Sequence, residues 1–155
     1  MSDWRDSLKN HFDSLKEQKQ KKEESQQKLD IVKMEFLEKV IMPAYNEIEK
    51  ELIKHKRKIE THNQLLEVFK VNLEELEFEK LEFSYEIVLR IKNQQIIPFA
   101  KIKFWDKSKQ AHATDVLVPI KIKQGQQEKY YSINEISKEE LIEHIIFKYT
   151  HFTGS

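Results

Sequence analysis

The chain has 155 residues, of which 35% are charged and 39% are hydrophobic, and its 27 basic residues balance its 27 acidic residues. The length fits one compact domain or a small domain with a helical extension, and the zero net charge excludes a global attraction to nucleic acid or acidic membranes. The absence of cysteine excludes disulfides and thiolate nucleophiles. The chain has only two glycines, Gly125 and Gly154, and they are far apart. A phosphate-binding loop needs several glycines in a short span, so the sequence excludes this class of site.

The N-terminal residues carry no apolar run, and no segment approaches the roughly 20 apolar residues that a membrane-spanning helix needs. We therefore expect no signal peptide, no membrane partner and a cytoplasmic location. No motif in the chain indicates a cofactor, and we expect none.

The first predicted element is a helix. Its apolar residues are spaced four, four and three apart, namely Trp4, Leu8, Phe12 and Leu15. Residues 16–28 contain no apolar side chain, so this segment is either a solvated continuation of the helix or a frayed linker. Because positions seven apart stay mostly apolar across the segment, we expect a continuous or nearly continuous helix.

The helical pattern continues from Leu29 to about Lys56, with Pro43 in its middle. Proline lacks an N–H donor and clashes with the preceding turn, so it predicts a kink, a break or the first turn of a new helix. The residues that we expect to make helix contacts are Phe36, Ile41, Tyr45, Ile48 and Leu52. A single helix cannot bury such a seam, so it forms an intramolecular hairpin, pairs with a second copy or docks on another protein.

The segment 58–76 has two interpretations. Its apolar residues keep the heptad spacing that begins at Ile41, which predicts one coiled-coil-like helix to residue 77. A basic cluster at 54–58, weak helix formers at 61–63 and strand-forming residues at 68–71 instead predict a pair of short strands. The expected domain organisation is a helical region at 1–57, or to 77, followed by a region at 58–155 that contains a sheet.

Beyond Leu76 the apolar period changes to two, which predicts an antiparallel sheet. The opposite face of the first strand carries Glu82 and Glu86. Its core face consists of Leu81, Phe83, Tyr85, Ile87, Leu89 and Ile91. A turn at 93–95 leads to a second strand at 97–105, and 106–115 is predicted to be a polar loop. A third strand presents to the core Val116, Val118, Ile120 and Ile122.

The last predicted element is a helix at 137–151. Ser137 and Glu140 have the spacing of a capping box, and the apolar face that follows them is suited to cover one side of the sheet. The predicted fold is therefore α+β. It has a long N-terminal helix or helical hairpin of coiled-coil type, an antiparallel meander of four to six strands and a covering C-terminal helix.

The sequence offers little support for catalysis. Two histidine pairs, His55 with His62 and His144 with His151, are seven residues apart, whereas a helical metal site needs spacings of three or four. There is no Gly-x-Ser-x-Gly motif, and adjacent glutamates are typical of a solvated surface. We expect neither a metal site nor a catalytic site, and hence a protein that is not an enzyme.

Charge is distributed unevenly along the predicted sheet. Residues 74–86 have six Glu and one Lys, a net −5, whereas residues 87–129 have nine Lys or Arg and three acids, a net +6. A candidate basic binding face on the outer side of the sheet consists of Lys101, Lys103, Trp105, Lys121 and Lys123. Such a face can attract phosphates and stack a base. Cross-strand pairing of its lysines with Glu82 and Glu86 is the ordinary structural alternative.

The sequence does not specify a biological role. The leading hypothesis is a non-catalytic interaction or scaffold protein that self-associates, or binds a protein partner, through its N-terminal helices. The alternative is a nucleic-acid-binding module that uses the basic face with Trp105.

Overall fold

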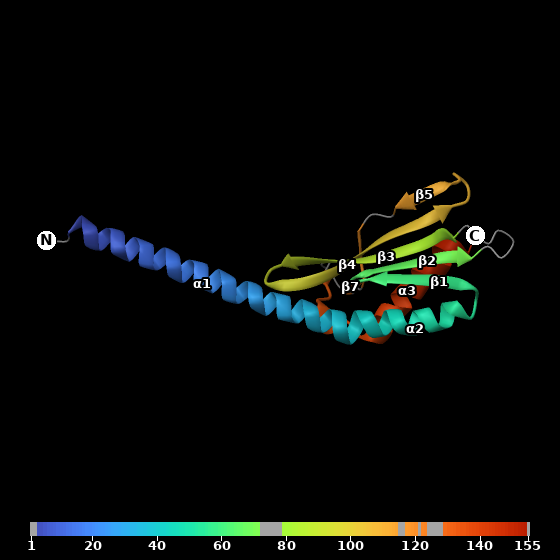
Figure 1. Ribbon diagram of the computed structural model, residues 1–155, viewed down its shortest axis with the longest axis horizontal. Helices are drawn as coiled ribbons and strands as arrows, with labels where there is room; N and C mark the ends of the chain where they lie inside the picture. The colour runs from blue at the N-terminus through green and yellow to red at the C-terminus, as the bar shows by residue number, and fades with distance from the viewer. Residues whose placement is uncertain (1–2, 72–78, 115–116, 121, 124–128, 155) are drawn as a thin grey trace. The chain divides into compact units, whose positions relative to one another are not determined.

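The computed structural model describes residues 3–71, 79–114, 117–120, 122–123 and 129–154 (Figure 1). The chain divides into two units, Met1–Glu35 and Phe36–Ser155. Unit 1 contains nearly all of helix α1 (Trp4–Phe36), whereas unit 2 contains the sheets and the helices α2 (Met42–Ile53) and α3 (Lys138–Thr153). The fold is α+β with a long N-terminal helix, an antiparallel meander and a C-terminal helix, which confirms the predicted fold class.

Helix α1 runs through the segment that lacks apolar side chains. It is 33 residues long and includes all of residues 16–28, so the prediction of a continuous helix is confirmed. Lys, Glu and Gln lose little side-chain freedom in a helix, which makes this composition compatible with helix even without a face to bury.

A π-helix, η1 (Leu37–Ile41), joins α1 to α2. Pro43 lies in the first turn of α2, and Ile41 and Met42 before it have helical backbone angles. The N–H of Met42 instead bonds the carbonyl of Leu37, five residues earlier. The sequence predicts three outcomes for Pro43, and the structure matches the third, because Pro43 lies in the first turn of α2. The single wide turn of η1 connects α2 to α1.

The strands of the sheet follow one another as hairpins. Their bounds are β1 (Arg57–His62), β2 (Leu65–Val71), β3 (Glu79–Lys92), β4 (Gln95–Asp106), β5 (Ala111–Thr114), β6 (Val118–Pro119), β7 (Ile122–Lys123) and β8 (Lys129–Tyr130). The main sheet has the antiparallel order β1-β2-β3-β4-β5, and β6 adds a short pairing with β4. Strands β7 and β8 form a separate two-stranded sheet.

The segment 58–76 contains strands, which decides between its two interpretations. β1 pairs with β2 over the whole length of β1, from Arg57 opposite Lys70 to His62 opposite Leu65. Leu66 and Val68 alternate into the core, whereas Phe69 of the heptad series is only half-buried. The helical alternative is wrong for 57–71, and residues 72–76 lie outside the described part of the chain.

Two expectations for the later strands need correction. The predicted polar loop 106–115 contains β5, because Ala111–Thr114 pairs with the end of β4. The predicted third strand is instead divided between β6 in the main sheet and β7 in the second sheet, and within it Ile120 is buried. Val116 lies outside the described residues.

Helices α2 and α3 pack on the same face of the main sheet (Figure 1). The centre of the core is the middle of β3, where Phe83, Tyr85 and Ile87 are fully buried, as the alternation of that strand predicts. Leu141 and Ile145 of α3 are buried above it. The capping box of α3 is confirmed, because the Glu140 N–H donates to Ser137 Oγ at 3.1 Å and the Ser137 N–H donates to Glu140 Oε1 at 3.2 Å.

Candidate functional site

The five predicted helix-contact residues lie inside unit 2. All have exposed fractions of 8% or less: Phe36, Ile41, Tyr45, Ile48 and Leu52. The Tyr45 hydroxyl donates to the Gln64 carbonyl at 2.7 Å, which ties α2 to the turn between β1 and β2. Burial raises the pKa of Tyr45 far above its usual value. These side chains form the chain's own core and present no surface to a partner.

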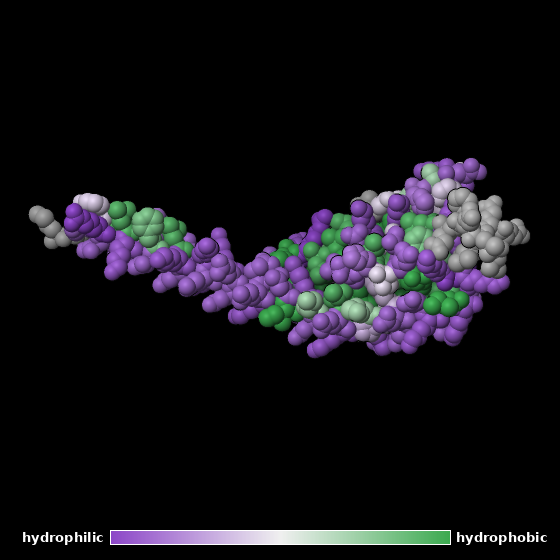
Figure 2. Space-filling model, in the orientation of Figure 1, coloured by the Kyte–Doolittle hydropathy of each residue, from purple (hydrophilic) through white to green (hydrophobic). Residues whose placement is uncertain are grey.

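The remaining part of the predicted seam is an apolar stripe on α1. We use this name for four side chains with exposed fractions of 66%, 46%, 56% and 45%: Trp4, Leu8, Phe12 and Leu15. Figure 2 shows apolar surface near the start of α1, followed by a hydrophilic stretch of the same helix. The described residues of unit 1 form one helix, and one helix cannot cover its own stripe.

The structure brings together only part of the predicted basic face. Lys101 and Lys103 are exposed on the outer side of β4, opposite Glu86 and Ser84 of β3. Trp105, further along β4, is half-buried. The backbone of Lys123 belongs to β7 in the second sheet, and Lys121 lies outside the described residues.

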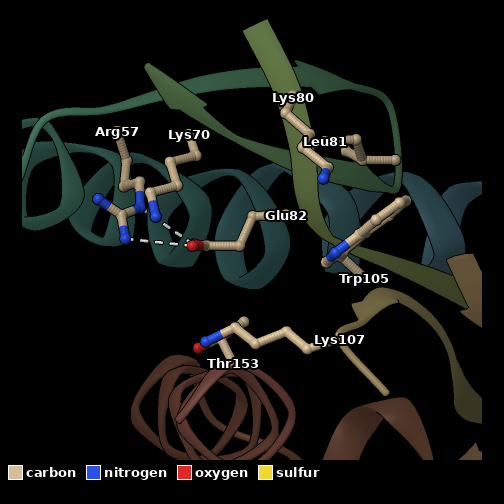
Figure 3. A pocket seen from close by; sticks show the side chains of 8 residues that line it. All are labelled: Arg57, Lys70, Lys80, Leu81, Glu82, Trp105, Lys107 and Thr153. Atoms are coloured by element: carbon tan, nitrogen blue, oxygen red, sulfur yellow. Dashed lines mark hydrogen bonds and ion pairs between the residues drawn. The ribbon is translucent and has the colours of Figure 1, made fainter. Parts of the chain in front are cut away.

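A different group of basic residues lines a pocket of about 300 Å³ at one end of the sheet. This basic pocket is lined by Arg57, Lys70, Lys80, Leu81, Glu82, Trp105, Lys107 and Thr153 (Figure 3). It lies where β1 and β3 begin, where β2 and β4 end, and where α3 contributes its last residue. Four cations and one carboxylate give the described lining residues a net charge of +3.

A β-bulge in β3 turns Glu82 toward the basic pocket. Phe69 is opposite Leu81 while Val68 is opposite Phe83, which leaves Glu82 as the extra residue. A bulge re-aims the side chain at that point, so Glu82 leaves the outer face that simple alternation predicts for it. The expected pairing of Glu82 with the lysines of β4 is therefore wrong.

Glu82 is held by two partners from different elements. Its carboxylate accepts two hydrogen bonds from Arg57, at 3.0 Å from Nε and 3.1 Å from Nη2, and a short one from the hydroxyl of Tyr149. Hydrogen bonding to Glu82 raises the pKa of Arg57, and burial together with that carboxylate raises the pKa of Tyr149 to about 12. The charges of Arg57 and Glu82 neutralise each other at the side of the pocket.

Three basic residues form a row across the adjacent strands. Arg57 is directly opposite Lys70, and Lys70 is directly opposite Lys80. Directly opposite residues of an antiparallel pair place their side chains on the same face, and like charges in such pairs are destabilising. The row concentrates positive charge at the end of the sheet where the pocket opens.

Trp105 forms one wall of the basic pocket, and its ring contacts two other side chains. The ammonium of Lys80 lies 3.4 Å from the centroid of the Trp105 ring, and the imidazole of His112 packs against it edge-on at 5.1 Å. Figure 3 shows Lys80 above this ring and Lys107 extending toward Thr153. The cation on the indole occupies a face on which a nucleic-acid base would otherwise stack.

A buried polar pair lies away from the pocket, beneath α3. The Tyr85 hydroxyl and His144 Nδ1 are 2.8 Å apart, and the two rings pack edge to face. Burial, with a smaller contribution from Lys148, lowers the pKa of His144 to about 4. The imidazole is therefore neutral at neutral pH, and its Nδ1 can accept a hydrogen bond from the Tyr85 hydroxyl.

The part of the chain that the structure describes offers neither a metal site nor a membrane-spanning helix. Among those residues, no group of three or more His, Asp and Glu side chains is placed to hold a metal ion. No described helix has both the length and the apolar character that crossing a bilayer demands.

Sequence reasoning did not find the basic pocket. Its cations come from positions 57, 70, 80 and 107, which become neighbours only through the strand pairing of 57–71 with 79–92. The available signal was weak: basic residues recur where predicted strands begin or end. No protein-family model, curated protein or solved structure matches the chain, so the geometry of these surfaces carries the case for function.

Proposed function

We propose that this protein is a non-catalytic, cytoplasmic interaction protein that self-associates through the apolar stripe of α1. The observation that carries the proposal is the exposure of four large apolar side chains along one side of a single helix. Apolar groups gathered in this way mark contact surfaces, whereas scattered ones are ordinary. The partner that we assign to the stripe is a second copy of the same chain.

The size of the side chains supports antiparallel pairing of two stripes. When two copies of α1 run in opposite directions, Trp4 faces Leu15 of the partner copy and Leu8 faces its Phe12. Each aromatic ring then meets a smaller leucine, which permits close packing. Parallel pairing in register would instead place the two Trp4 rings against each other.

The energetic balance predicts a weak dimer. Eight side chains, each about half exposed and each contributing about 1.5–3 kcal/mol when fully buried, supply about 6–12 kcal/mol in total. Association opposes this with about 4–15 kcal/mol of lost freedom. We therefore expect a Kd in the micromolar range or weaker, roughly −8 kcal/mol at most.

Sedimentation velocity over roughly micromolar to millimolar concentrations tests this proposal. We expect a shift from monomer to dimer in the unchanged chain and a monomer in the Leu8→Glu variant, because burying the new carboxylate in the stripe is unfavourable. Asn10→Glu is the matched control. It adds the same charge about 200° around the helix and leaves the dimer intact.

The emission of Trp4 supplies a second measurement. In a Trp105→Phe background Trp4 is the single indole, and its emission shifts to shorter wavelength as the dimer forms. A chain that stays monomeric at the highest concentration overturns the proposal. So does equal weakening by Leu8→Glu and Asn10→Glu, since the contact would then not involve the stripe.

A nucleic-acid-binding module is the second candidate function. It is favoured by the neighbouring exposed side chains of Lys101 and Lys103 on β4. The contact of Lys80 with the Trp105 ring weighs against base stacking on that indole, so this function ranks below self-association.

A further inference from the structure

The basic pocket has three cations that its own carboxylate does not balance. Arg57 is committed to Glu82 through Nε and Nη2, and its Nη1 donates to the His55 carbonyl at 3.0 Å. Lys70 and Lys107 form no ion pair with another described residue, and the ammonium of Lys80 rests on the Trp105 ring. Among the described lining residues, the positive charges therefore outnumber the negative ones.

We propose that the basic pocket binds a small phosphorylated molecule through its phosphoryl group. A phosphoryl group carries nearly two negative charges and three acceptor oxygens, which match three lysine side chains better than a single carboxylate does. The ligand would also relieve the repulsion between Lys70 and Lys80, which lie directly opposite each other on adjacent strands.

The pocket sets limits on the rest of the ligand. Its volume of about 300 Å³ is at the lower end of small-molecule sites, which fits a phosphate ester of modest size. Leu81 and the half-buried Trp105 provide apolar wall for the organic part. The Arg57–Glu82–Tyr149 hydrogen bonds hold the opposite side in place.

The emission of Trp105 reports binding in a Trp4→Phe chain, in which Trp105 is the only indole. Titration with inorganic phosphate, ribose 5-phosphate and adenosine monophosphate should give a saturable change, because a phosphoryl group near Lys80 alters the cation on the ring. Tighter binding of the two esters than of inorganic phosphate supports recognition of a phosphorylated organic molecule. Equal affinities support a site for phosphate alone.

Two double variants remove the same amount of charge from different places. Lys70→Gln with Lys107→Gln removes two cations from the pocket and should weaken binding about tenfold or more, since hydrogen bonds to charged groups are lost. Lys101→Gln with Lys103→Gln removes two cations from the outer side of β4 and should leave the affinity unchanged. Thermal unfolding checks that each variant is folded, and Lys107→Gln alone serves if the double variant is not.

Three results would overturn the proposal. One is the absence of saturable binding with all three probes at low salt. Another is equal weakening by the two double variants, which would mean that only the general charge of the protein attracts the probes. The third is binding of a single-stranded oligonucleotide that strengthens with its length and is lost in the Lys101/Lys103 variant, which would assign the anion-binding surface to the outer face of β4.

Discussion

His144 shows how a single half-buried side chain couples this fold to pH. Its imidazole contacts the buried Tyr85 hydroxyl, and its pKa is about 4 in the folded protein against about 6.5 in an unfolded chain. Above pH 6.5 both states are neutral and the contact contributes fully to stability. As the pH falls toward 4, the unfolded chain takes up a proton that the folded protein resists, so stability is lost over this window.

We therefore expect the protein to lose about 1 kcal/mol of unfolding free energy between pH 7 and pH 5 through His144, a value reduced for its partial exposure. Urea unfolding at the two pH values measures the loss. The His144→Gln variant keeps a hydrogen-bonding partner for Tyr85 but cannot titrate, so its stability should change less over the same interval. An identical pH response in both proteins would contradict this assignment.

At the scale of elements, the hairpins of this sheet are turned without glycine. The turn between β3 and β4 has positive φ at Asn93 (51°) and Gln94 (61°), and the turn after β1 has positive φ at Asn63 (54°). Asparagine tolerates this conformation, whereas glutamine adopts it at a conformational cost of about 1–2 kcal/mol. The scarcity of glycine therefore did not prevent a meander, but it left strain in its turns.

Gln94→Gly should stabilise the protein by about 0.5–1 kcal/mol. The substitution relieves the left-handed strain, and the greater freedom of glycine in the unfolded chain offsets about half of that gain. Thermal or urea unfolding measures the change. Gln95→Gly is the control: it lies in β4, outside the positive-φ residues, and should destabilise the protein. Stabilisation by both changes would show that turn strain is not the cause.

Much of each element could be predicted from local pattern, and the exceptions have physical causes. The alternation of β3 and β4 and the Ser137–Glu140 cap were readable because burial and capping have fixed spacings. The segment 57–71 was ambiguous because its apolar residues keep a heptad spacing while its residue types favour strands. The bulge at Glu82 depends on pairing with β2, and no residue type in β3 predicts it. Because of that bulge, the Arg57–Glu82 pair could not be predicted from the sequence.

At the scale of the whole molecule, the core lies entirely in the second unit. Every buried apolar side chain among the described residues belongs to Phe36 or to a later position. The fold class could be predicted because it depends on the order of periodic segments. The candidate sites could not: one predicted set of contacts proved to be core, and the basic pocket gathers residues from four strands, a turn and a helix.

A chain that begins at Leu29 should therefore keep its fold. We expect its thermal midpoint to change by less than about 4 °C, since the removed residues contribute no core, and we expect its concentration-dependent association to disappear. Differential scanning calorimetry and sedimentation velocity measure the two effects. A large fall in the midpoint would show that the N-terminal helix stabilises the sheet, and persistent association would place the dimer contact elsewhere.

The meander order also determines how the sheet can assemble. Strands β1 to β5 each pair with the next one in sequence, and the longest pairing joins β3 to β4 across a two-residue turn. Most strand contacts are therefore between segments close in sequence, which corresponds to a low contact order. Closing each short connection costs little chain entropy before the strands form their hydrogen bonds. Folding can start at the β3–β4 hairpin and add neighbours outward. The packing of α3, which carries the last residues of the core, is then the natural closing step.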